Sequence, residues 1–278
     1  MSDSGKEPRR WALILGITGG SGSAIARAVA GDPGLNIFGV HRGNWPSAVP
    51  PLEEAVRAQG SRTELLLGDA GTADGAAAGA HEIARRLGPG AIKLFVHAIA
   101  NASVGRLSVT GDERLHRRRL EKTFDSMAHS FVYWTQALLD RDLLAPEAQV
   151  LGLSNPMDDA VVRGTAAIAA SKAALGAYVR HLAHELGPQG FRVNLLKFGA
   201  VATQATGRTF GPAGFARLRE VVQGAIPARR LCTADEMGRF VSVLAGPRGA
   251  WFNGATIDFT GGEFQGLMNA LLDKGESP

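Results

Sequence analysis

Short apolar runs alternate with segments of helical periodicity along most of the chain. This alternation predicts one α/β domain over residues 1–278, with a doubly wound (Rossmann-type) parallel sheet of seven strands and helices on both faces. We expect strands at Ala12–Ile17, Asn36–Val40, Thr63–Leu67, Ile92–Ile99, Gln149–Ser154, Arg192–Phe198 and Thr256–Phe259. Helices are expected near Ser23–Ala30, Leu52–Gln59, Ala73–Leu87, Asp112–Arg141, Thr165–Leu186 and Ala234–Leu244.

The segment that follows the sixth predicted strand lacks this regularity. Residues Ala202–Arg230 carry scattered Gly, Pro and Thr around a short helical stretch near Phe215–Val222. In folds of this kind, an insertion over a sheet edge covers the substrate, and we expect that role here. A plain surface loop is the alternative.

Composition agrees with a globular domain and narrows the classes of partner. The 278 residues are 45% apolar and 20% charged, which is enough to build a sizeable core. The formal net charge of +4 is a mild excess that requires no nucleic-acid partner. The densest basic run, His116–Arg119, is predicted to lie on the solvated face of a helix rather than in a phosphate-binding patch.

The number of cysteines and the length of the apolar runs indicate which metal sites and which cell compartment to expect. The single cysteine, Cys232, excludes an intrachain disulfide and a multi-cysteine zinc site, and we expect no metal. Arg9-Arg10 followed by Trp11–Ile17 mimics a secretion signal, but the apolar run ends in glycine-rich sequence, which favours a first strand. No stretch reaches the length that a membrane span needs. We therefore expect a soluble, cytoplasmic protein.

A glycine-rich loop, GITGGSGS, follows the first predicted strand and precedes the first predicted helix. Glycines permit a sharp turn, and they let backbone amides approach a pyrophosphate at the positive end of the helix. An ordinary structural turn is the alternative. We expect the loop to bind a nicotinamide dinucleotide, with contacts from Gly16, Thr18, Ser23 and Ala24.

Residues at the ends of the second and third predicted strands are predicted to bind the adenosine of the dinucleotide. Arg42 takes the place where many dinucleotide sites have a ribose-binding carboxylate, and it is predicted to pair with a 2′-phosphate. NADPH would then be preferred over NADH, unless Arg42 is an ordinary surface arginine. Asp69, with Ala70 beside it, is predicted to accept a hydrogen bond from the adenine amino group. Alternatively, Asp69 is the N-cap of a helix over residues 70–76.

These segments, with VHAI at 96–99 and ASKAAL at 170–175, resemble the short-chain dehydrogenase/reductase superfamily almost end to end. Within it, the chain is most similar to the divergent branch of bacterial enoyl-acyl-carrier-protein reductases, as the stretches 95–99, 186–194 and 259–269 indicate. The resemblance implies that Lys172 holds the nicotinamide ribose, although a surface lysine is the alternative. It also implies a cofactor site lined by Ala98, Ile99, Ala100, Val201 and Thr203.

The sequence departs from this family at the catalytic tyrosine. Ordinary members carry it four residues before the lysine, and the enoyl reductase branch carries it seven before. Those positions here are Ile168 and Thr165. The two tyrosines of the chain, Tyr133 and Tyr178, occupy neither position.

The other catalytic positions are only partly kept. Ser154 matches the usual serine, but the asparagine of ordinary members is Met127 and the first tyrosine of the enoyl branch is Asn155. Ser154 and Lys172 are therefore the surviving pair, with Thr165 as a further hydroxyl.

Loss of the tyrosine weakens some reactions more than others. One oxyanion donor is typically worth about 2.7 to 4 kcal/mol, and the hydroxyl of Thr165 falls ~4 Å short of a tyrosine's. A water or the ribose hydroxyl would have to bridge that gap. Hydride transfer depends mainly on positioning, so an activated C=C bond tolerates the loss better than a plain ketone. His97 is expected to be packed and bonded to backbone, and Asp158 and Asp159 to be solvated, rather than to replace the acid.

We therefore expect an NADPH-dependent reductase of an activated C=C bond, in an enoyl thioester or a biosynthetic enone. Lys172 would position the cofactor, and Ser154 and Thr165 would lie nearest the reacting oxygen. A cofactor-binding pseudoenzyme (sensor or scaffold) is one alternative, and a ketone or imine reductase that uses water or substrate as the acid is another. By analogy with the superfamily, the helices at Asp112–Arg141 and Thr165–Leu186 predict a homotetramer.

Overall fold

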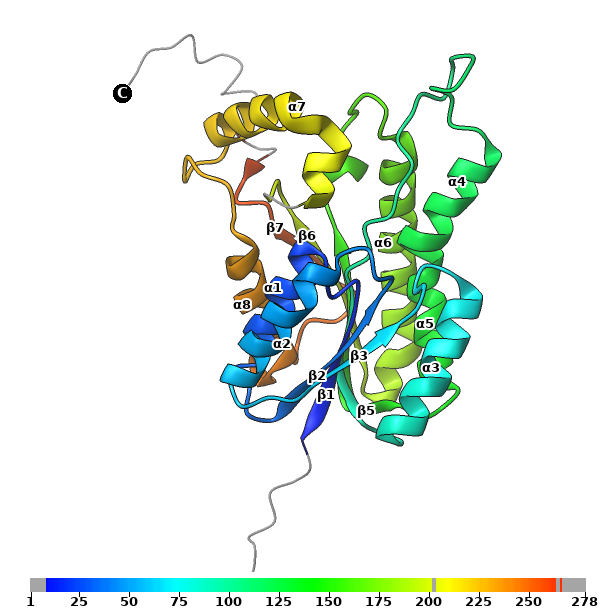
Figure 1. Ribbon diagram of the computed structural model, residues 1–278, viewed down its shortest axis with the longest axis vertical. Helices are drawn as coiled ribbons and strands as arrows, with labels where there is room; N and C mark the ends of the chain where they lie inside the picture. The colour runs from blue at the N-terminus through cyan, green and yellow to red at the C-terminus, as the bar shows by residue number, and fades with distance from the viewer. Residues whose placement is uncertain (1–8, 202–203, 264–265, 267–278) are drawn as a thin grey trace, which may run out of the picture.

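The computed structural model describes residues 9–201, 204–263 and 266. Its strands form one parallel sheet in the order β3-β2-β1-β4-β5-β6-β7, which confirms the doubly wound fold (Figure 1). The strand order reverses between β1 and β4. The strands are β1 Arg10–Leu15, β2 Leu35–His41, β3 Thr63–Leu67, β4 Ile92–His97, β5 Leu144–Ser154, β6 Arg192–Phe198 and β7 Thr256–Phe259.

Helices cover both faces of this sheet. In Figure 1, α3, α4, α5 and α6 lie on one side, α1, α2 and α8 lie on the other, and α7 lies beyond the carboxyl ends of the strands. The bounds are α1 Gly20–Val29, α2 Val49–Ala58, α3 Ala73–Leu87, α4 Arg117–Phe124, α5 Ser130–Leu139, α6 Ala166–Leu186, α7 Gln204–Ala225 and α8 Ala234–Ala245.

Alternate side chains of the central strands enter two separate hydrophobic cores. In β1, Leu13 and Leu15 belong to the core that includes residues of α3, α5 and α6. Ala12 and Ile14 belong to the other core, with residues of α1, α2 and α8. Because successive strand side chains point to opposite faces, a strand covered on both faces must be apolar throughout. This is why the strands appear in the sequence as continuous apolar runs.

The prediction of one helix over Asp112–Arg141 is wrong at its start. The residues just before α4 pair with the preceding loop instead, and the backbone N–H of Leu115 donates to the carbonyl of Arg106 at 2.8 Å. Gly111 has a φ of 78°, which belongs to a turn and not to a helix. The helix therefore begins only at Arg117.

The same stretch is also interrupted in its middle, where Asp125–His129 form a π-helical segment between α4 and α5. The Ser126 hydroxyl donates to the Lys122 carbonyl at 2.8 Å, and the Ser130 hydroxyl donates to the Ser126 carbonyl at 3.0 Å. Side-chain bonds of this kind compete with the regular helical ladder. The basic and aromatic pattern of the sequence gives no sign of this irregularity.

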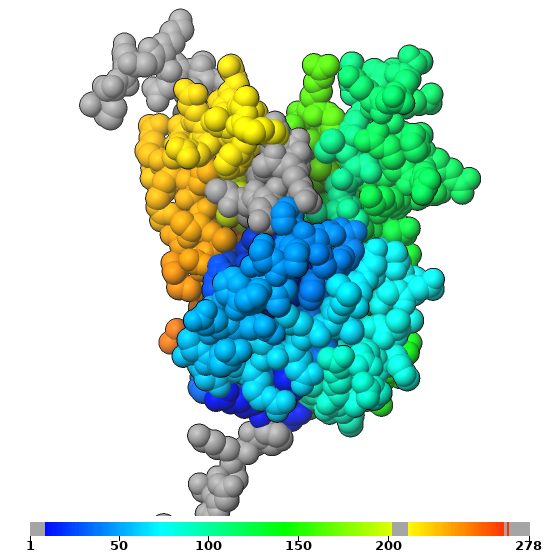
Figure 2. Space-filling view, in the orientation of Figure 1, coloured from blue at the N-terminus to red at the C-terminus, as the bar shows by residue number. Residues whose placement is uncertain are grey.

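The helix expected near Phe215–Val222 is longer than predicted. α7 covers Gln204–Ala225, and its axis is broken at Gly211, where φ is 69° and ψ is 170°. Pro212 follows and cannot donate a helical hydrogen bond, so the break falls where the backbone chemistry demands it. In Figure 2, α7 (yellow) and α4 (green) lie on opposite sides of the same end of the molecule.

Several strand bounds also differ from those expected, and β2 extends one residue further at each end. β1 ends at Leu15 because Gly16 turns with a φ of 76°, and β4 ends at His97, two residues early. β5 begins at Leu144, five residues before the predicted start, and its pairing with β4 shifts register next to Ile92. Over the ranges described, no helix is long and apolar enough to cross a membrane. The same residues hold no His, Cys, Asp and Glu group suited to a metal ion.

Candidate active site

The carboxyl ends of adjacent strands bring the predicted site residues to one edge of the sheet. Arg42 follows β2 and Gly16 follows β1. Ala98 follows β4, and Ser154 is the last residue of β5. These four strands are neighbours in the order β2-β1-β4-β5, with about 4.8 Å between each pair. Ligands of open α/β sheets bind at this edge, where the strand order reverses.

The glycine-rich loop has a backbone that only glycine accommodates. Gly16 has a positive φ, and a Cβ placed on it would lie 2.6 Å from the carbonyl oxygen of Ala98. The N–H of Gly19 donates to the Gly16 carbonyl at 3.0 Å, which closes the turn. α1 then begins at Gly20 with no side-chain cap and no acidic residue in its first turn. Uncapped amides at the positive end of a helix suit an anionic pyrophosphate.

The other predicted loop contacts differ in accessibility. Thr18 is buried, and the half-buried Ser23 donates its hydroxyl to the Gly20 carbonyl at 3.3 Å. Ala24 is buried too, and its carbonyl faces α8, where a Cβ on Gly238 would lie 2.7 Å from it. The close approach of these two helices therefore fixes the direction of α1 toward the loop.

Arg42 and Asp69 lie beside each other at the ends of β2 and β3. The Arg42 Nη1 to Asp69 Oδ2 distance is 3.9 Å, and the Arg42 side chain is 36% exposed. Asp69 accepts the N–H of Gly71 at 3.0 Å. The alternative role of Asp69 as an N-cap is wrong, because α3 is capped by Thr72, whose side chain accepts from Gly75 N at 3.0 Å. Ala70 is buried, and its carbonyl accepts the indole N–H of Trp134.

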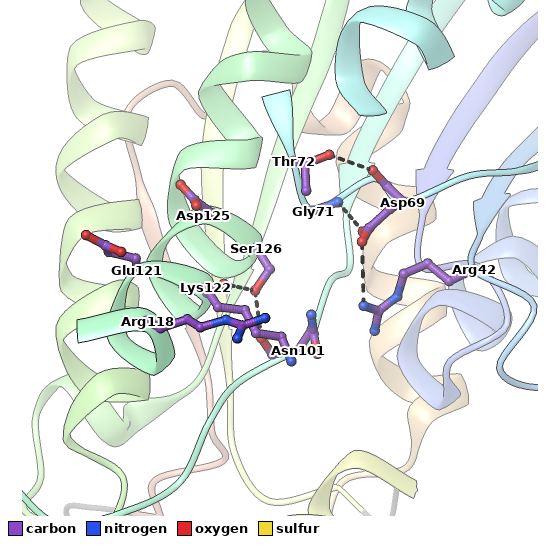
Figure 3. Close-up of a pocket in the computed structure, with 10 residues that line it drawn as sticks. All are labelled: Arg42, Asp69, Gly71, Thr72, Asn101, Arg118, Glu121, Lys122, Asp125 and Ser126. Atoms are coloured by element: carbon purple, nitrogen blue, oxygen red, sulfur yellow. Dashed lines mark hydrogen bonds and ion pairs between the residues drawn. The ribbon is translucent and has the colours of Figure 1, made fainter. Parts of the chain in front are cut away.

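A cavity of about 290 Å³ opens next to this pair (Figure 3). It lies between the ends of β2 and β3 on one side and α4 with the π-helical segment on the other. The basic run His116–Arg119 is exposed apart from Arg119, which is half-buried, as expected of a solvated face. Arg118 nevertheless lines the cavity. The full lining is Arg42, Asp69, Gly71, Thr72, Asn101, Arg118, Glu121, Lys122, Asp125 and Ser126.

Lys172 is buried on α6, so the alternative of a surface lysine is wrong. Its side chain is carried on a helix face of small residues that packs against β5 and β6, and its Nζ donates to the carbonyl of Leu153 at 2.7 Å. Burial lowers the pKa of the Lys172 ammonium to about 8, and the nearby Asp158 carboxylate opposes that shift. At neutral pH the group remains mostly cationic next to the end of β5.

Ser154 and Thr165 are both buried, with 1% and 3% of their surfaces exposed. The Ser154 hydroxyl contacts the Asn155 carbonyl at 3.3 Å, a long hydrogen bond. The Thr165 hydroxyl donates to the Val162 carbonyl at 2.9 Å, in the turn that leads into α6. Ser154 is thus the more easily redirected donor of the two.

His97 is fully buried at the end of β4, but its partner is not the expected backbone group. Its Nε2 lies 2.8 Å from the Ser130 hydroxyl of α5. Burial and, to a smaller extent, the nearby Lys172 charge together lower the pKa of His97 to about 3. A neutral imidazole is poorly suited to act as an acid at physiological pH.

Residues 98–100 leave the sheet edge after β4. Ala98 donates its N–H to the Leu15 carbonyl at 3.1 Å, and exposure increases from Ala98 and Ile99 to Ala100. Val201 is buried and forms a β-bridge with Cys232. Thr203 lies outside the described residues.

The two tyrosines make contacts on the α4–α5 side of α6. The Tyr178 hydroxyl lies 3.0 Å from Nδ1 of His129. Burial raises the pKa of Tyr133, and a hydrogen bond with Asp125 adds to that rise. Ile168, at the ordinary tyrosine position, is a buried residue of α6. The hydroxyl nearest in sequence to Lys172 on its N-terminal side is Ser171, which is bonded to the Ile168 carbonyl.

Lys197 is a site residue that the sequence analysis missed. It pairs with Ser154 in register across β5 and β6, so it lies at the same edge. Its ammonium binds Asp158 at 3.0 Å and Asp159 at 2.7 Å. The prediction that both aspartates are solvated is wrong for Asp158, whose side chain is 13% exposed, whereas Asp159 is 60% exposed. A lysine between apolar residues at the end of the strand was the available signal.

The chain is similar in sequence to known reductases. Residues 16–263 match the family described as Enoyl-(Acyl carrier protein) reductase. The NADH-dependent enoyl-acyl-carrier-protein reductase FabI of Escherichia coli (strain K12) is 28% identical over 177 residues, which are 64% of this chain and 66% of that protein. The 3-oxoacyl-acyl-carrier-protein reductase FabG of Pseudomonas aeruginosa is 28% identical over 256 residues, 91% of this chain and 96% of that protein.

Solved structures share the fold at lower identity. L-sorbose reductase from Gluconobacter frateurii, complexed with NADPH and L-sorbose, superposes with a TM-score of 0.81 at 19% identity and covers 93% of this chain and 97% of its own. The 3-oxoacyl-acyl-carrier-protein reductase from Brucella melitensis, in complex with NAD, gives a TM-score of 0.77 at 23% identity over 93% and 98%. At these identities the likeness concerns the fold.

Proposed function

We propose that this chain reduces an activated C=C bond with NADPH. The premise is that it belongs to the enoyl-(acyl carrier protein) reductase family of the short-chain dehydrogenase/reductase superfamily. Its substrate class is an enoyl thioester or an enone. The observation that carries this proposal is the buried, cationic Lys172 beside Ser154. Both lie at the sheet edge that also holds the glycine-rich loop and the N-terminus of α1, which has no side-chain cap.

The residues present fit a nicotinamide dinucleotide. The loop at Gly16 leaves no room for a side chain, and the amides at the start of α1 would hold the pyrophosphate. Arg42 and Asp69 would hold the adenosine, and Lys172 the nicotinamide ribose hydroxyls. When bound, the reduced nicotinamide supplies the hydride.

NADPH is favoured over NADH by the charge at the end of β2. Arg42 is partly exposed, and its only ion-pair contact among the described residues is the long one to Asp69. A guanidinium in this state has donors left for a phosphomonoester, whereas a carboxylate in its place would accept from a ribose hydroxyl.

Ser154 is the residue that we assign to the reacting oxygen. Negative charge that develops on the substrate carbonyl during reduction needs a nearby donor. Ser154 gives up only a 3.3 Å hydrogen bond when its hydroxyl rotates toward that oxygen, whereas Thr165 would give up one of 2.9 Å. Thr165 then acts mainly by fixing the entry to α6.

The proposal is tested by following NADPH oxidation with a panel of enoyl thioesters and enones. We expect consumption of NADPH with at least one conjugated substrate, and formation of the saturated product by mass spectrometry. Protein that is shown to bind NADPH but oxidises none with either class would refute the proposed reaction.

A cofactor-binding pseudoenzyme is the second candidate, and one observation favours it. Ser154, Thr165 and Lys172 each donate a hydrogen bond to a main-chain carbonyl, so both hydroxyls must leave a protein partner before they bind a substrate oxygen. For a sensor or scaffold, NADPH should raise the melting temperature while no substrate is turned over. Lys172→Met should then alter binding alone.

Reduction of a ketone or imine is a further possibility that the Pseudomonas aeruginosa relative supports, since it is a 3-oxoacyl reductase that matches across most of both chains. Water or a substrate group would then supply the proton. Product analysis separates the two reactions, because the C=C reductase yields a saturated carbonyl compound and the ketone reductase yields an alcohol.

A further inference from the structure

Three consecutive arginines of α4 have different surroundings. Arg117 forms an ion pair with Glu121, with Nε and Oε1 2.6 Å apart. Arg119 donates to the carbonyls of Asp112 and Arg114 at 3.1 and 3.3 Å, and so fastens the preceding loop. The guanidinium of Arg118 has no hydrogen-bond or ion-pair partner within residues 9–201, 204–263 and 266. Two of the three guanidinium groups thus have partners within the described residues, and that of Arg118 has none.

The unoccupied arginine points into the cavity of about 290 Å³ (Figure 3). Arg118 extends from α4 toward Asn101, and Arg42 extends toward the same place from the end of β2. Lys122, one helical turn after Arg118, adds a third cation to the lining. Cationic side chains from two distant parts of the chain therefore converge across one cavity.

The lining also holds three carboxylates, and two of them, Glu121 and Asp125, are directed away from the converging cations. Glu121 is bound by Arg117, and Asp125 interacts with Tyr133. In Figure 3 the side chains of both acids point away from Asn101. One carboxylate oxygen of Asp69 accepts a hydrogen bond from the N–H of Gly71, and the other lies 3.9 Å from Nη1 of Arg42.

The frame behind the cavity is rigid. The Ser126 hydroxyl lies 2.6 Å from the carbonyl of Asn101 and shares its one proton between that oxygen and the Lys122 carbonyl, which joins the π-helical segment to the loop after β4. A Cβ on Gly71 would lie 2.9 Å from the Cβ of Ser126, so the loop after β3 is in close contact with the same segment. The separation of the two cationic walls is therefore fixed by backbone packing and not by flexible side chains alone.

We propose that Arg118, assisted by Lys122, is a specificity-determining residue that binds the phosphomonoester on the adenosine ribose from the side opposite Arg42. This inference rests on the proposed function, since it assigns a further part of the same dinucleotide site. The pyrophosphate is provided for by the start of α1, whereas this cavity adjoins Asp69 and Arg42, where the adenosine is expected. Two guanidinium groups on opposite sides suit a dianionic group better than a neutral ribose hydroxyl.

The test measures binding of nucleotide fragments that cannot donate a hydride. Adenosine 2′,5′-bisphosphate, adenosine 3′,5′-bisphosphate and 5′-AMP are titrated into the full-length protein by isothermal calorimetry. For Arg118→Ala we expect the affinity for the 2′,5′-bisphosphate to fall about five- to tenfold, because one charge-assisted contact at a partly exposed site is lost. The affinity for 5′-AMP should change less than about twofold, since that ligand lacks the 2′-phosphate.

Arg117→Ala is the matched control, because it removes the same charge from the neighbouring position while Arg117 lies outside the cavity lining. It should change both affinities by less than about twofold, because the side chain of Glu121, which it releases, points away from Asn101. Equal effects of Arg118→Ala and Arg117→Ala would overturn the proposal, as would an equal loss of 5′-AMP binding. Preferred binding of the 3′,5′-bisphosphate would overturn the assignment to a 2′-phosphate. Melting temperatures of both variants verify that each is folded.

The outcome does not depend on whether the protein is a reductase. If no substrate is reduced but the Arg118-dependent preference for the 2′,5′-bisphosphate is present, the inference holds and the proposed reaction fails. If NADPH-dependent reduction is found and Arg118→Ala leaves its KM for NADPH unchanged, the proposed function holds and this inference fails.

Discussion

At the ends of β2 and β3, the groups expected to bind the adenosine are partly exposed and loosely paired. Arg42 has one long ion pair, and Arg118 has no partner among the described residues. At the end of β5 and in the second turn of α6, by contrast, Ser154 and Lys172 are buried and bonded to main-chain carbonyls. The first region is ready to receive an anion from solvent. The second must exchange internal hydrogen bonds before it acts on a ligand.

This difference separates binding from chemistry. Exposed cations lose little hydration when a phosphate arrives, whereas a buried donor must first break a bond to the protein. The proposed loss of a catalytic tyrosine is therefore compatible with a functioning nucleotide site at the place proposed. Substitutions that act on one region and not on the other are the most direct way to test that separation.

Lys172→Met should have the largest effect. We expect kcat/KM for NADPH-dependent reduction to fall by about 1000-fold, since both a positioning contact and a nearby positive charge are lost. The melting temperature of the unliganded protein should not fall, because burial disfavours the charge. Steady-state kinetics and thermal unfolding measure the two quantities. A variant with near-normal kcat/KM would show that Lys172 is a core residue without a role in the site.

Ser154→Ala should lower kcat by about 100-fold, which is typical for removal of one oxyanion donor. Thr165→Ala serves as its comparison, because that hydroxyl is bonded to the Val162 carbonyl, and it should lower kcat less than about threefold. NADPH affinity, measured by fluorescence titration, should be unchanged in both. The reverse order of effects would exchange the roles of the two hydroxyls.

Gly16→Ala should weaken NADPH binding by about 30-fold, through backbone strain and a clash with the Ala98 carbonyl. Gly60→Ala is the matched control, because Gly60 also has a positive φ of 79° but has nothing within 4 Å of its added Cβ. The control should lose only the stability that a positive φ costs an alanine, without losing NADPH binding. If both variants bind NADPH normally, the glycine loop does not contact the cofactor.

The smallest expected effect is on pH dependence. Because the pKa of Lys172 is about 8 when folded and 10.5 ordinarily, the unfolded chain holds a proton in this window that the folded protein releases. The contribution of Lys172 to stability therefore increases as pH rises from 8 toward 10.5. NADPH binding should move the opposite way and weaken about fivefold between pH 8 and pH 9.

The same measurement on Lys172→Met shows whether Lys172 is the group that titrates. In that variant the part of the pH dependence that Lys172 contributes should be absent from both the melting temperature and the NADPH titration. An identical decline of NADPH binding in the variant and in the unchanged protein would assign the titration to another residue.

The order of elements and the position of the glycine loop follow from the sequence alone. A strand covered on both faces must be apolar, and a backbone with positive φ favours glycine, so both leave a local pattern. The start of α4 and the irregular segment after it leave no such pattern in the sequence. There, backbone pairing with a loop and hydrogen bonds of serine hydroxyls replace the regular helix. Local periodicity does not record such competition.

Tertiary structure alone decided which polar side chains are free to act. Lys197 lies beside Ser154 and neutralises Asp158 because β5 and β6 pair in a particular register, although 38 residues separate Lys197 from Asp159 along the chain. Arg118 differs from Arg117 and Arg119 only in the direction that a helix gives it. Residue identity fixes what a side chain is able to bind, but packing between distant segments fixes what it meets.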